Sequence, residues 1–424
     1  MKKLVTLALA LAVMLCGAVA LAEVSPDGRE IITFWNSYTN VDEAAIVRDV
    51  VDGYNESQDK YYVDMVSAGS DIQKIIVSIA NREAPDVYQT SNATIISLQS
   101  NGLLSPLDDY AKADGYDLTA YSTQAIESNT LDGQVYGLLF GINIIQMFYN
   151  KDLLEQYGYS EPPETMEELY DMAVTITSLD ESGNIDVLGY PCFPFASARQ
   201  ELIYAFGGRW WAEDGVTLTP NAQGVIDSLN MNVKFRELYG INQVQSFLAT
   251  ANTNRYTEQD MFFAGKQLFR LDGPWLASMI ENYNSDVNYG VTLVPGTEAH
   301  PEYRGASRFE TTSVCIPVTA EHKEGAWDFM KYYTNSEGTK KLIIGLGNLP
   351  AAKWMWDDEE VLAVPVFDAF IEALRQENGI LYPKIAEYSK YTSLIEEHLD
   401  YVYNGVMTPE DAMNLLYEQA KNLQ

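Results

Sequence analysis

The sequence predicts an α/β protein built as two lobes of mostly parallel sheet with flanking helices. Three observations support this class. Strand-like and helix-like segments alternate from residue 29 onward, which is typical of repeated β-α units. One apolar segment, residues 138–158, is too long for an ordinary strand and is interrupted by Gly141 and Asn143, as in a strand that crosses between two lobes. No internal repeat, low-complexity tract or long flexible linker separates the parts.

The first lobe begins with residues 29–37, whose β-branched and aromatic bias indicates a buried strand. Residues 41–57 follow, with apolar side chains at helical spacing. After them we expect a strand at 61–69, a helix at 70–85, a strand at 86–91 and a helix at 92–104. Units of this size imply a mostly parallel sheet that is covered on both faces.

The second half continues with helix and strand patterns. We expect helices at 164–177, 222–239 and 257–266, strands at 287–296 and 311–319, and a last helix within 408–424. For the last helix, Thr408 is the expected N-cap and Pro409 the first-turn residue.

Residues 1–22 predict an export signal rather than a part of the fold. A positively charged start precedes an apolar run that ends in Ala20-Leu21-Ala22, so cleavage is expected before Glu23. Cleavage before Cys16 with lipid attachment is the less favoured alternative, because Leu15 is bulky where that processing needs a small residue. No later segment has the ~18 unbroken apolar residues of a membrane span. The processed chain is therefore expected to be exported, extracellular or periplasmic.

The bulk composition and the motif search exclude several function classes. The net charge is −33, so nucleic acid is excluded as a partner, because phosphate binding needs a basic face. The sequence contains no nucleophile elbow, HExxH, P-loop or dinucleotide-binding glycine motif. The three histidines stand in separate polar segments, and Cys192 and Cys315 are expected to be free, buried thiols rather than a disulfide. We therefore expect no metal, no cofactor and no catalysis.

Seven motifs occur in the order found in one family of binding proteins. They are ITFWNSYTN (32–40), APDVYQTSNATIISLQSNGLLSPLDDY (84–110), DGQVYGLLFGINIIQMFYNKDLLEQYG (132–158), FFAGKQLFRLDGPW (262–275), NYGVTLVPG (288–296), GAWDFMKYYTNSEGTKKL (325–342) and LGNLPAAK (346–353). With these motifs the chain resembles the bacterial extracellular solute-binding proteins of ABC sugar importers (family 1, maltose-binding-protein-like), over nearly all of its processed length.

The resemblance implies a periplasmic-binding-protein fold (type II), in which two α/β lobes with an interlobe cleft are joined by a hinge. We assign residues 23–138 and 290–335 to the N-terminal lobe, and residues 139–289 and 336–424 to the C-terminal lobe. The family's function implies a monomeric receptor that binds a carbohydrate, expected to be an oligosaccharide. The receptor delivers this small-molecule sugar to the membrane permease of an ABC transporter by hinge closure.

Two alternatives stay open beside this interpretation. The same fold could bind a non-sugar solute, such as a polyamine, a peptide or a phosphate ester. A secreted glycoside-acting enzyme needs only a pair of carboxylates, and the 60 acidic residues provide chance pairs.

Trp275 is the first candidate for ligand binding. It follows Gly273 and Pro274 at the end of an apolar strand, and the resemblance matches it to a tryptophan that stacks on the ligand. A flat aromatic ring can desolvate the C–H face of a sugar while hydrogen bonds hold its polar rim. The alternative is a core tryptophan that closes the turn between a strand and a helix.

Asn143 is the second candidate, as a short polar residue in the apolar crossover segment. Its amide can both donate to and accept from a ligand hydroxyl, and a hydrogen bond within the hinge is the alternative. Of Trp210 and Trp211, which follow a Gly-Gly pair, one is expected to line the cleft and the other to pack.

The remaining candidates stand near expected strand ends. Ser37, Tyr38 and Asn92 follow strands of the first lobe, where a capping or turn role is the alternative. Arg308 can bind two neighbouring hydroxyls or pair with the nearby carboxylate of Glu310. Asn348, in the motif LGNLP, completes the expected ligand-binding set.

Overall fold

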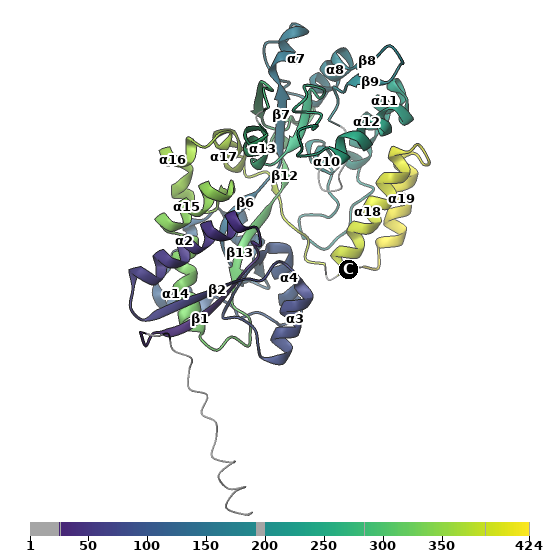
Figure 1. The fold of residues 1–424 in the computed structure, drawn as a ribbon. Coiled ribbons are helices and arrows are strands. Elements are labelled where there is room, and N and C mark those ends of the chain that lie inside the picture. The colour runs from purple at the N-terminus through teal and green to yellow at the C-terminus, as the bar shows by residue number, and fades with distance from the viewer. Residues whose placement is uncertain (1–24, 26, 192–199, 284, 386, 424) are drawn as a thin grey trace, which may run out of the picture.

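The protein is an α/β molecule of two lobes, seen side by side in the computed structural model (Figure 1). The structure describes residues 25, 27–191, 200–283, 285–385 and 387–423. The expected export signal, residues 1–22, and Cys192 lie outside the described residues. Cys315 is described and is a free, buried thiol, as expected from the sequence.

The N-terminal lobe contains a six-stranded sheet in the order β14-β6-β13-β3-β1-β2. Its strands are β1 (Glu30–Asn36), β2 (Tyr61–Ser67), β3 (Val87–Ser91), β6 (Leu138–Asn143), β13 (Glu310–Cys315) and β14 (Leu349–Pro350). Strands β2 and β3 pair with β1 in parallel, whereas β13 runs antiparallel to both β3 and β6. The carboxyl ends of β1, β2, β3 and β6 therefore lie at the same edge as the amino end of β13.

Helices cover both faces of this sheet, as expected from the β-α pattern. One face packs against α2 (Val41–Ser57), α14 (Lys323–Thr334) and α15 (Glu337–Leu346). The other face packs against α3 (Ile72–Asn81) and α4 (Asn92–Ser100), with Tyr88 and Cys315 in the layer between. Six shorter helices complete this part: α5 (Asp108–Asp114), η1 (Leu118–Ala120), α6 (Thr123–Ser128), η3 (Lys353–Asp357), α16 (Glu359–Leu362) and α17 (Phe367–Arg375). A hairpin of β4 (Thr130–Leu131) and β5 (Gln134–Val135) follows α6.

Helix α2 shows how local sequence sets an element. Asn40 caps its start, because its side-chain oxygen accepts from the backbone N–H of Asp42 at 2.9 Å. Val47, Val50 and Tyr54 then form a buried stripe toward the sheet. The bounds predicted from the sequence, 41–57, are those of the helix.

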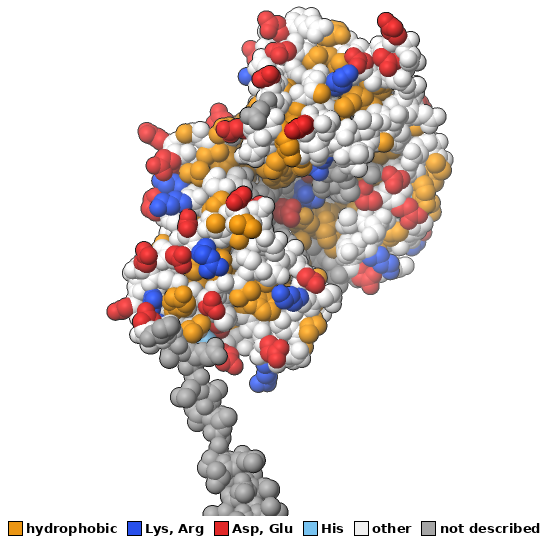
Figure 2. Space-filling model, viewed as in Figure 1, with side chains coloured by type: hydrophobic (Ala, Val, Ile, Leu, Met, Phe, Trp, Pro, Cys, Tyr) orange, Lys and Arg blue, Asp and Glu red, His pale blue; other side chains and the backbone are white. Residues whose placement is uncertain are grey.

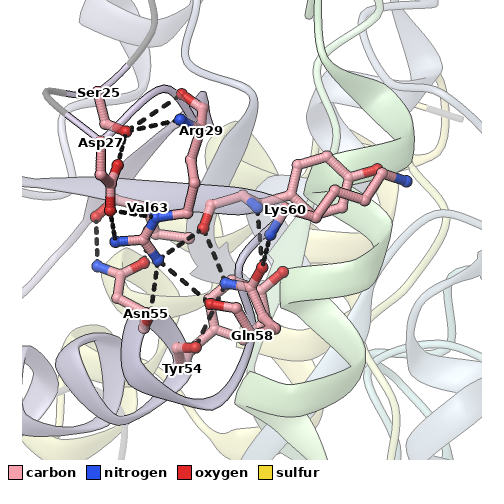
Figure 3. A network of polar contacts seen from close by, with 9 residues as sticks. Ser25, Asp27, Arg29, Tyr54, Asn55, Gln58, Lys60 and Val63 are labelled. Atoms are coloured by element: carbon pink, nitrogen blue, oxygen red, sulfur yellow. Dashed lines mark hydrogen bonds and ion pairs between the residues drawn. The ribbon is translucent and has the colours of Figure 1, made fainter.

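Arg29 fastens the start of β1 to the end of α2 (Figure 3). Its guanidinium donates to the carbonyl oxygens of Asn55 at 2.6 Å and Gln58 at 3.3 Å, and to the carboxylate of Asp27 at 2.8 Å. The Asn55 side chain in turn binds both backbone groups of Val63. These contacts stabilise the amino edge of the sheet, opposite the edge where β1 to β3 end.

The C-terminal lobe contains a three-stranded sheet in the order β10-β7-β11. Its strands are β7 (Gln146–Asn150), β10 (Phe269–Asp272) and β11 (Tyr289–Thr292), and both outer strands run antiparallel to β7. This differs from the mostly parallel sheet expected for the second lobe. The apolar pattern of a strand predicts its burial but not the direction of its neighbours, which here is set by the helical connections.

Helices surround the small sheet and form two further cores. They are α7 (Lys151–Gln156), α8 (Met166–Ile176), α10 (Glu201–Ala205), α11 (Gln223–Tyr239), α12 (Ile241–Thr253), α13 (Trp275–Asn282), α18 (Tyr388–Tyr403) and α19 (Pro409–Ala420). A hairpin, β8 (Ser178–Leu179) with β9 (Ile185–Val187), follows α8. Helix α19 is capped by Thr408 and begins at Pro409, as predicted.

The prediction of a helix at 257–266 is wrong, because the structure has turns there. The side chain of Asp260 accepts from the backbone N–H groups of Phe262 and Tyr256 at 2.9 and 2.8 Å. It also binds Arg270. These side-chain contacts replace the backbone bonds that a helix would need.

The sheets divide the chain differently from the expected lobe boundaries at three places. Strand β6 pairs within the N-terminal sheet, although residues from 139 onward were assigned to the other lobe. Strand β11 pairs with β7 in the C-terminal sheet. Helix α15 packs against α2 and strand β14 pairs with β6, so the stretch from α15 to β14, assigned to the C-terminal lobe, belongs with the N-terminal lobe. The sequence pattern locates elements, whereas long-range pairing decides which sheet each one joins.

The chain crosses between the lobes at three places. Ile144 and Ile145 connect β6 to β7, and residues 293–309 connect β11 to β13 through η2 (Pro301–Tyr303) and β12 (Ser307–Arg308). The third crossing, between α17 and α18, contains β15 (Gly379–Ile380), which pairs with β12. The first two crossovers are braced against each other. The buried side chain of Gln146 accepts from the N–H of Val294 at 2.9 Å and donates to the carbonyl of Gly305 at 3.0 Å. These bonds join the two crossovers directly. Among the described residues no helix has the length and apolar character needed to cross a membrane.

Candidate functional site

An inner pocket of about 400 Å³ lies at the carboxyl ends of β1 and β3, beside the amino end of β13. It is lined by Ser37, Tyr38, Ser70, Thr90, Ser91, Thr94, Glu310, Thr311 and Thr312. In the sheet, the connection after β1 leads outward to β2, whereas β3 lies on the other side of β1. The pocket therefore occupies the point where the strand order reverses, which is where open α/β sheets bind ligands.

Every side chain that lines the inner pocket carries an oxygen atom. Hydroxyl groups can donate and accept, so they suit a ligand that presents hydroxyls of its own. Ser37 accepts a hydrogen bond from Gln89 at 2.8 Å, which orients its hydroxyl. Among the described lining residues, Glu310 is the single charged one. This chemistry favours a neutral, polyhydroxylated ligand over an anion.

A second, outer pocket of about 250 Å³ lies between the lobes. One wall is α3 and α4 of the N-terminal lobe, and the other is the segment from Tyr382 to Ser389 that leads into α18. Tyr382 and Tyr388 supply aromatic rings, which meet edge to face with centroids 5.4 Å apart. Thr94 lines both pockets, so the two form neighbouring parts of one groove. Figure 2 shows the surface hollowed between the lobes, with acidic and basic side chains in the hollow.

Arg308 lies between the two pockets in a group that we name the Arg308 cluster: Arg308, Glu201, Glu310 and Tyr382. Its guanidinium is 3.6 Å from the Glu310 carboxylate of the inner pocket and 5.8 Å from the ring centre of Tyr382 in the outer pocket. Glu201 accepts from the backbone N–H of Arg308 at 3.1 Å. The Arg308 Nε and the Glu201 Oε1 are buried and have no hydrogen-bond partner among the described residues.

Glu201 is fully buried in this cluster. Burial raises the pKa of its carboxyl to about 7, although the neighbouring Arg308 opposes the shift. The side chain therefore changes its charge near neutral pH. Buried carboxyls that titrate in this range occur most often at functional sites.

Trp275 begins α13, directly after β10, and is half-buried against the core of the C-terminal lobe. It belongs to a second group, the Arg270 network: Arg270, Asp260, Asp272, Tyr256 and Trp275. Arg270 pairs with Asp260 at 2.7 Å and with Asp272 at 2.8 Å, and these three charged residues are buried. The indole N–H of Trp275 donates to the Tyr256 hydroxyl at 2.7 Å.

The structure brings five of the predicted ligand-binding residues to the inner pocket or to its border. Ser37 and Tyr38 line it, and Asn348 donates to the Tyr38 hydroxyl at 3.1 Å. Asn143 lies opposite Glu310 in the pairing of β6 with β13, and its buried side-chain oxygen has no hydrogen-bond partner in the part of the chain that the structure describes. Arg308 borders the pocket through Glu310.

Four predicted residues are not brought to either pocket. Trp275 lies in the Arg270 network of the C-terminal lobe and lines neither of them. Asn92 is fully buried and binds the backbone carbonyl of Phe309 and the N–H of Thr311, so it fastens α4 to β13. Trp210 is fully buried in the core of the C-terminal lobe. Trp211 packs edge to face behind Tyr388, with centroids 5.8 Å apart, and donates to a backbone carbonyl.

Sequence reasoning missed several residues that line the groove. Ser91 and Thr94 flank Asn92 at the start of α4, so the position was found but the wrong side chain was chosen. Thr311 and Thr312 begin a strand that was recognised only as apolar. Tyr382 precedes α18 and Tyr388 begins it, in a stretch rich in tyrosine, which is the one signal that could have indicated them.

The described residues contain no group of three or more His, Cys, Asp or Glu side chains that could hold a metal ion. The groove instead offers hydroxyls, an amide, aromatic rings and one Arg–Glu pair. These groups can bind a solute by hydrogen bonds and ring contacts.

A profile of the family described as "Bacterial extracellular solute-binding protein" matches residues 49–367. The maltotriose-binding protein of Pyrococcus abyssi (strain GE5 / Orsay) is 27% identical over 315 residues, which span 73% of this chain and 63% of that relative's length. The galactooligosaccharide-binding protein of Bacillus subtilis (strain 168) is 23% identical over 438 residues, which span 96% of this chain and 95% of that protein.

Solved structures share the fold over most of the chain. The sugar-binding protein MalE from Xanthomonas citri has a TM-score of 0.79 at 20% identity, covering 93% of this chain and 97% of that one. CpMnBP1 with mannobiose bound has a TM-score of 0.74 at 20% identity, covering 92% and 99%. The expected periplasmic-binding-protein fold is thereby confirmed.

The profile match spans well over half of the chain, and the fold agrees with it. The family consists of binding proteins rather than enzymes, as the lack of catalytic motifs predicts. The chain belongs to the bacterial extracellular solute-binding protein family.

Proposed function

We propose that this protein is a receptor for a neutral oligosaccharide and delivers it to an ABC importer. The observation that carries the proposal is the groove itself, in which a pocket whose described lining side chains all bear oxygen meets a pocket bordered by tyrosines. A sugar ring has a polar rim of hydroxyls and an apolar face of C–H groups, so the two pockets match its two kinds of surface.

The groove favours more than one sugar ring. Its two parts, of about 400 and 250 Å³, meet at Thr94 and extend from the sheet edge to the outside of α4. The names of the relatives agree with this size: one is a maltotriose-binding protein and another a galactooligosaccharide-binding protein. The solved neighbour CpMnBP1 was captured with mannobiose.

Hinge closure is the proposed response to the ligand. The outer pocket has one wall on each lobe, so a ligand there touches both lobes and favours the arrangement in which they are close. The crossover from β6 to β7 at Ile144 and Ile145 is short, as hinge segments are, and hydrogen bonds to Gly305 and Ser307 brace it. Trp275, at the edge of the C-terminal lobe, is proposed as a ring that stacks on the sugar after closure.

Calorimetry with maltotriose, mannobiose and a galactooligosaccharide tests the proposal. We expect one of them to bind in a one-to-one ratio and to be recovered unchanged, with a smaller radius of gyration in solution scattering. If none of them binds while a polyamine, a peptide or a phosphate ester does, the ligand class is wrong. Recovery of a cleaved sugar would contradict the receptor function.

A matched pair of variants links binding to the groove. Thr94→Val removes a hydroxyl from the residue that both pockets share, and we expect a Kd about 2- to 12-fold higher from the loss of one hydrogen bond. Thr175→Val makes the same change on the exposed face of α8 and should leave Kd unchanged. Equal effects of both variants would place the ligand elsewhere.

Export completes the proposal, because an importer's receptor must work outside the cytoplasm. We propose that residues 1–22 are removed, and that lipid attachment at Cys16 is the less favoured outcome. Mass spectrometry of the processed protein distinguishes a free Glu23 from an acylated Cys16.

A further inference from the structure

Trp275 stands at the end of the C-terminal lobe that faces the crossover. In the pairing of β10 with β7, Asp272 lies opposite Gln146, which is three residues from Asn143 of β6. At about 3.3 Å per residue, this separation is roughly 10 Å along the chain. The role of Trp275 as a sugar platform rests on the proposed function, and a platform is useful only if its ring has a fixed orientation.

The indole of Trp275 is fixed at two points. Its N–H donates to the Tyr256 hydroxyl at 2.7 Å. Its six-membered ring lies across Gly273, where a Cβ atom would be 2.1 Å from the ring. Gly273 thus leaves room for the ring, and Tyr256 fixes its polar edge.

Tyr256 is in turn held by buried charges. Its hydroxyl donates to the Asp272 carboxylate at 2.7 Å, and its backbone N–H donates to Asp260 at 2.8 Å. Its ring lies near two guanidinium groups, 4.2 Å from Arg255 and 5.2 Å from Arg270. The backbone has a φ of 54°, which is left-handed and costly for a tyrosine. The surrounding contacts therefore impose both the backbone and the ring position.

We infer that Tyr256 is a positioning residue that orients the Trp275 indole for the ligand. A phenol hydroxyl can donate to one partner and accept from another, so it links the buried Asp272 carboxylate to the edge of the indole. Phenylalanine can do neither. An indole that is already oriented loses little conformational entropy when a sugar stacks on it. The affinity for the sugar is therefore higher than with a mobile indole.

The test is Tyr256→Phe, which removes only the hydroxyl, followed by two measurements. In the unliganded protein labelled with ¹⁵N, the indole N–H signal of Trp275, assigned with Trp275→Phe, should move and should exchange with solvent at least about 10-fold faster. The Kd for maltotriose should rise about 2- to 12-fold, as expected for one side chain that must be ordered on binding.

Tyr239→Phe is the matched control for loss of stability. Its hydroxyl also makes a 2.7 Å hydrogen bond in the same lobe, to the carbonyl of Val174. We expect this variant to leave the Trp275 signal and Kd unchanged. An unchanged indole signal in Tyr256→Phe, or an equal rise of Kd in both variants, would overturn the inference. If the unchanged protein binds no sugar, the proposed function fails, whereas the indole signal still decides whether Tyr256 orients the ring.

Discussion

The Arg270 network and the Arg308 cluster are both built around a buried arginine, but they differ in how fully their charges are engaged. In the Arg270 network all four carboxylate oxygens of Asp260 and Asp272 accept hydrogen bonds. In the Arg308 cluster, one oxygen of Glu201 and the Nε of Arg308 have no partner among the described residues. Arg308 also reaches Glu310 only at 3.6 Å.

This difference indicates that Arg270 stabilises the fold, whereas Arg308 is available to bind a ligand. In the Arg270 network the four carboxylate oxygens are hydrogen-bonded, and the Arg270 Nη2, which makes no hydrogen bond with the described residues, still lies 2.8 Å from the Asp272 carboxylate. Such a closely paired network has one stable arrangement, so it fixes Trp275. A buried polar atom without a partner costs free energy, and such atoms concentrate where something else is to be bound. The Arg308 cluster borders the groove, so a ligand hydroxyl can supply the missing contacts.

The largest expected effect is that of Arg270→Met. It leaves Asp260 and Asp272 buried without their counter-ion, which should lower the free energy of unfolding by about 3 to 5 kcal/mol. Urea unfolding measures this loss. Arg375→Met is the control, because the Arg375–Asp357 pair is exposed and should contribute below about 1 kcal/mol. Similar losses in the two variants would show that the buried network is not the stabilising element we describe.

A pH-dependent effect is expected for Glu201→Gln. The folded pKa of Glu201 is about 7, above the ordinary 4.5, so the folded state favours the neutral carboxyl. Its contribution to stability is fully present below pH 4.5 and is lost as pH rises to 7. Glutamine does not titrate, so the unfolding free energy of the unchanged protein minus that of the variant should fall by roughly 2 to 3 kcal/mol between pH 5 and 8.

Chemical denaturation of both proteins at several pH values measures this difference. A difference that stays flat from pH 5 to 8 would mean that Glu201 is ionised throughout, and that its contacts with Arg308 outweigh its burial. The Arg270 network would then no longer be distinct from the Arg308 cluster in this respect.

Much of the N-terminal lobe could be predicted from the sequence, because its signals are local. The stripe of Val47, Val50 and Tyr54 indicates a helix with one buried face, and a polar residue after a strand, such as Ser37, indicates the sheet edge. The family motifs likewise follow the order of elements. These features depend on neighbours within a few residues.

The rest depends on contacts between distant residues. Asp260 lies in an apolar pattern that predicts a helix, and only its ion pair with Arg270, ten residues on, explains the turns. Trp210 and Tyr382 are equally plausible as ligand contacts by sequence, yet one is buried in the core and the other lines the groove. Which aromatic ring faces the groove is set by packing between lobes, which periodicity does not encode.

Gly273→Ala tests how Trp275 depends on the network beneath it. The added Cβ would be 2.1 Å from the indole, so the ring must move away from Gly273. We expect a loss of about 1 to 3 kcal/mol in stability and a weaker binding of maltotriose in calorimetry. Gly133→Ala is the control, because an added Cβ there would meet no atom within 4 Å. The φ of 77° makes alanine destabilising at this position, but we expect no effect on the groove. Unchanged affinity in Gly273→Ala would remove Trp275 from the ligand-binding surface.

The smallest effect is expected where the contact is neutral. Tyr38→Phe removes the hydroxyl that accepts from Asn348 at 3.1 Å, which should weaken maltotriose binding by about 1 kcal/mol. Burial raises the pKa of Tyr38 to about 12, so its hydroxyl stays protonated and the effect should be the same from pH 5 to 8. Calorimetry at these two pH values measures it.

Tyr391→Phe is the control for this last change. Its hydroxyl makes a 2.7 Å bond to the carbonyl of Trp210 in the core, so its loss should affect stability and not affinity. If the effect of Tyr38→Phe depended on pH, the titration of Glu201 would have to be coupled to the inner pocket through Arg308 and Glu310. We expect the effect of Tyr38→Phe to be independent of pH and the effect of Glu201→Gln to depend on it. Together these results would show that hydroxyl recognition in the groove does not depend on the charge state of the Arg308 cluster.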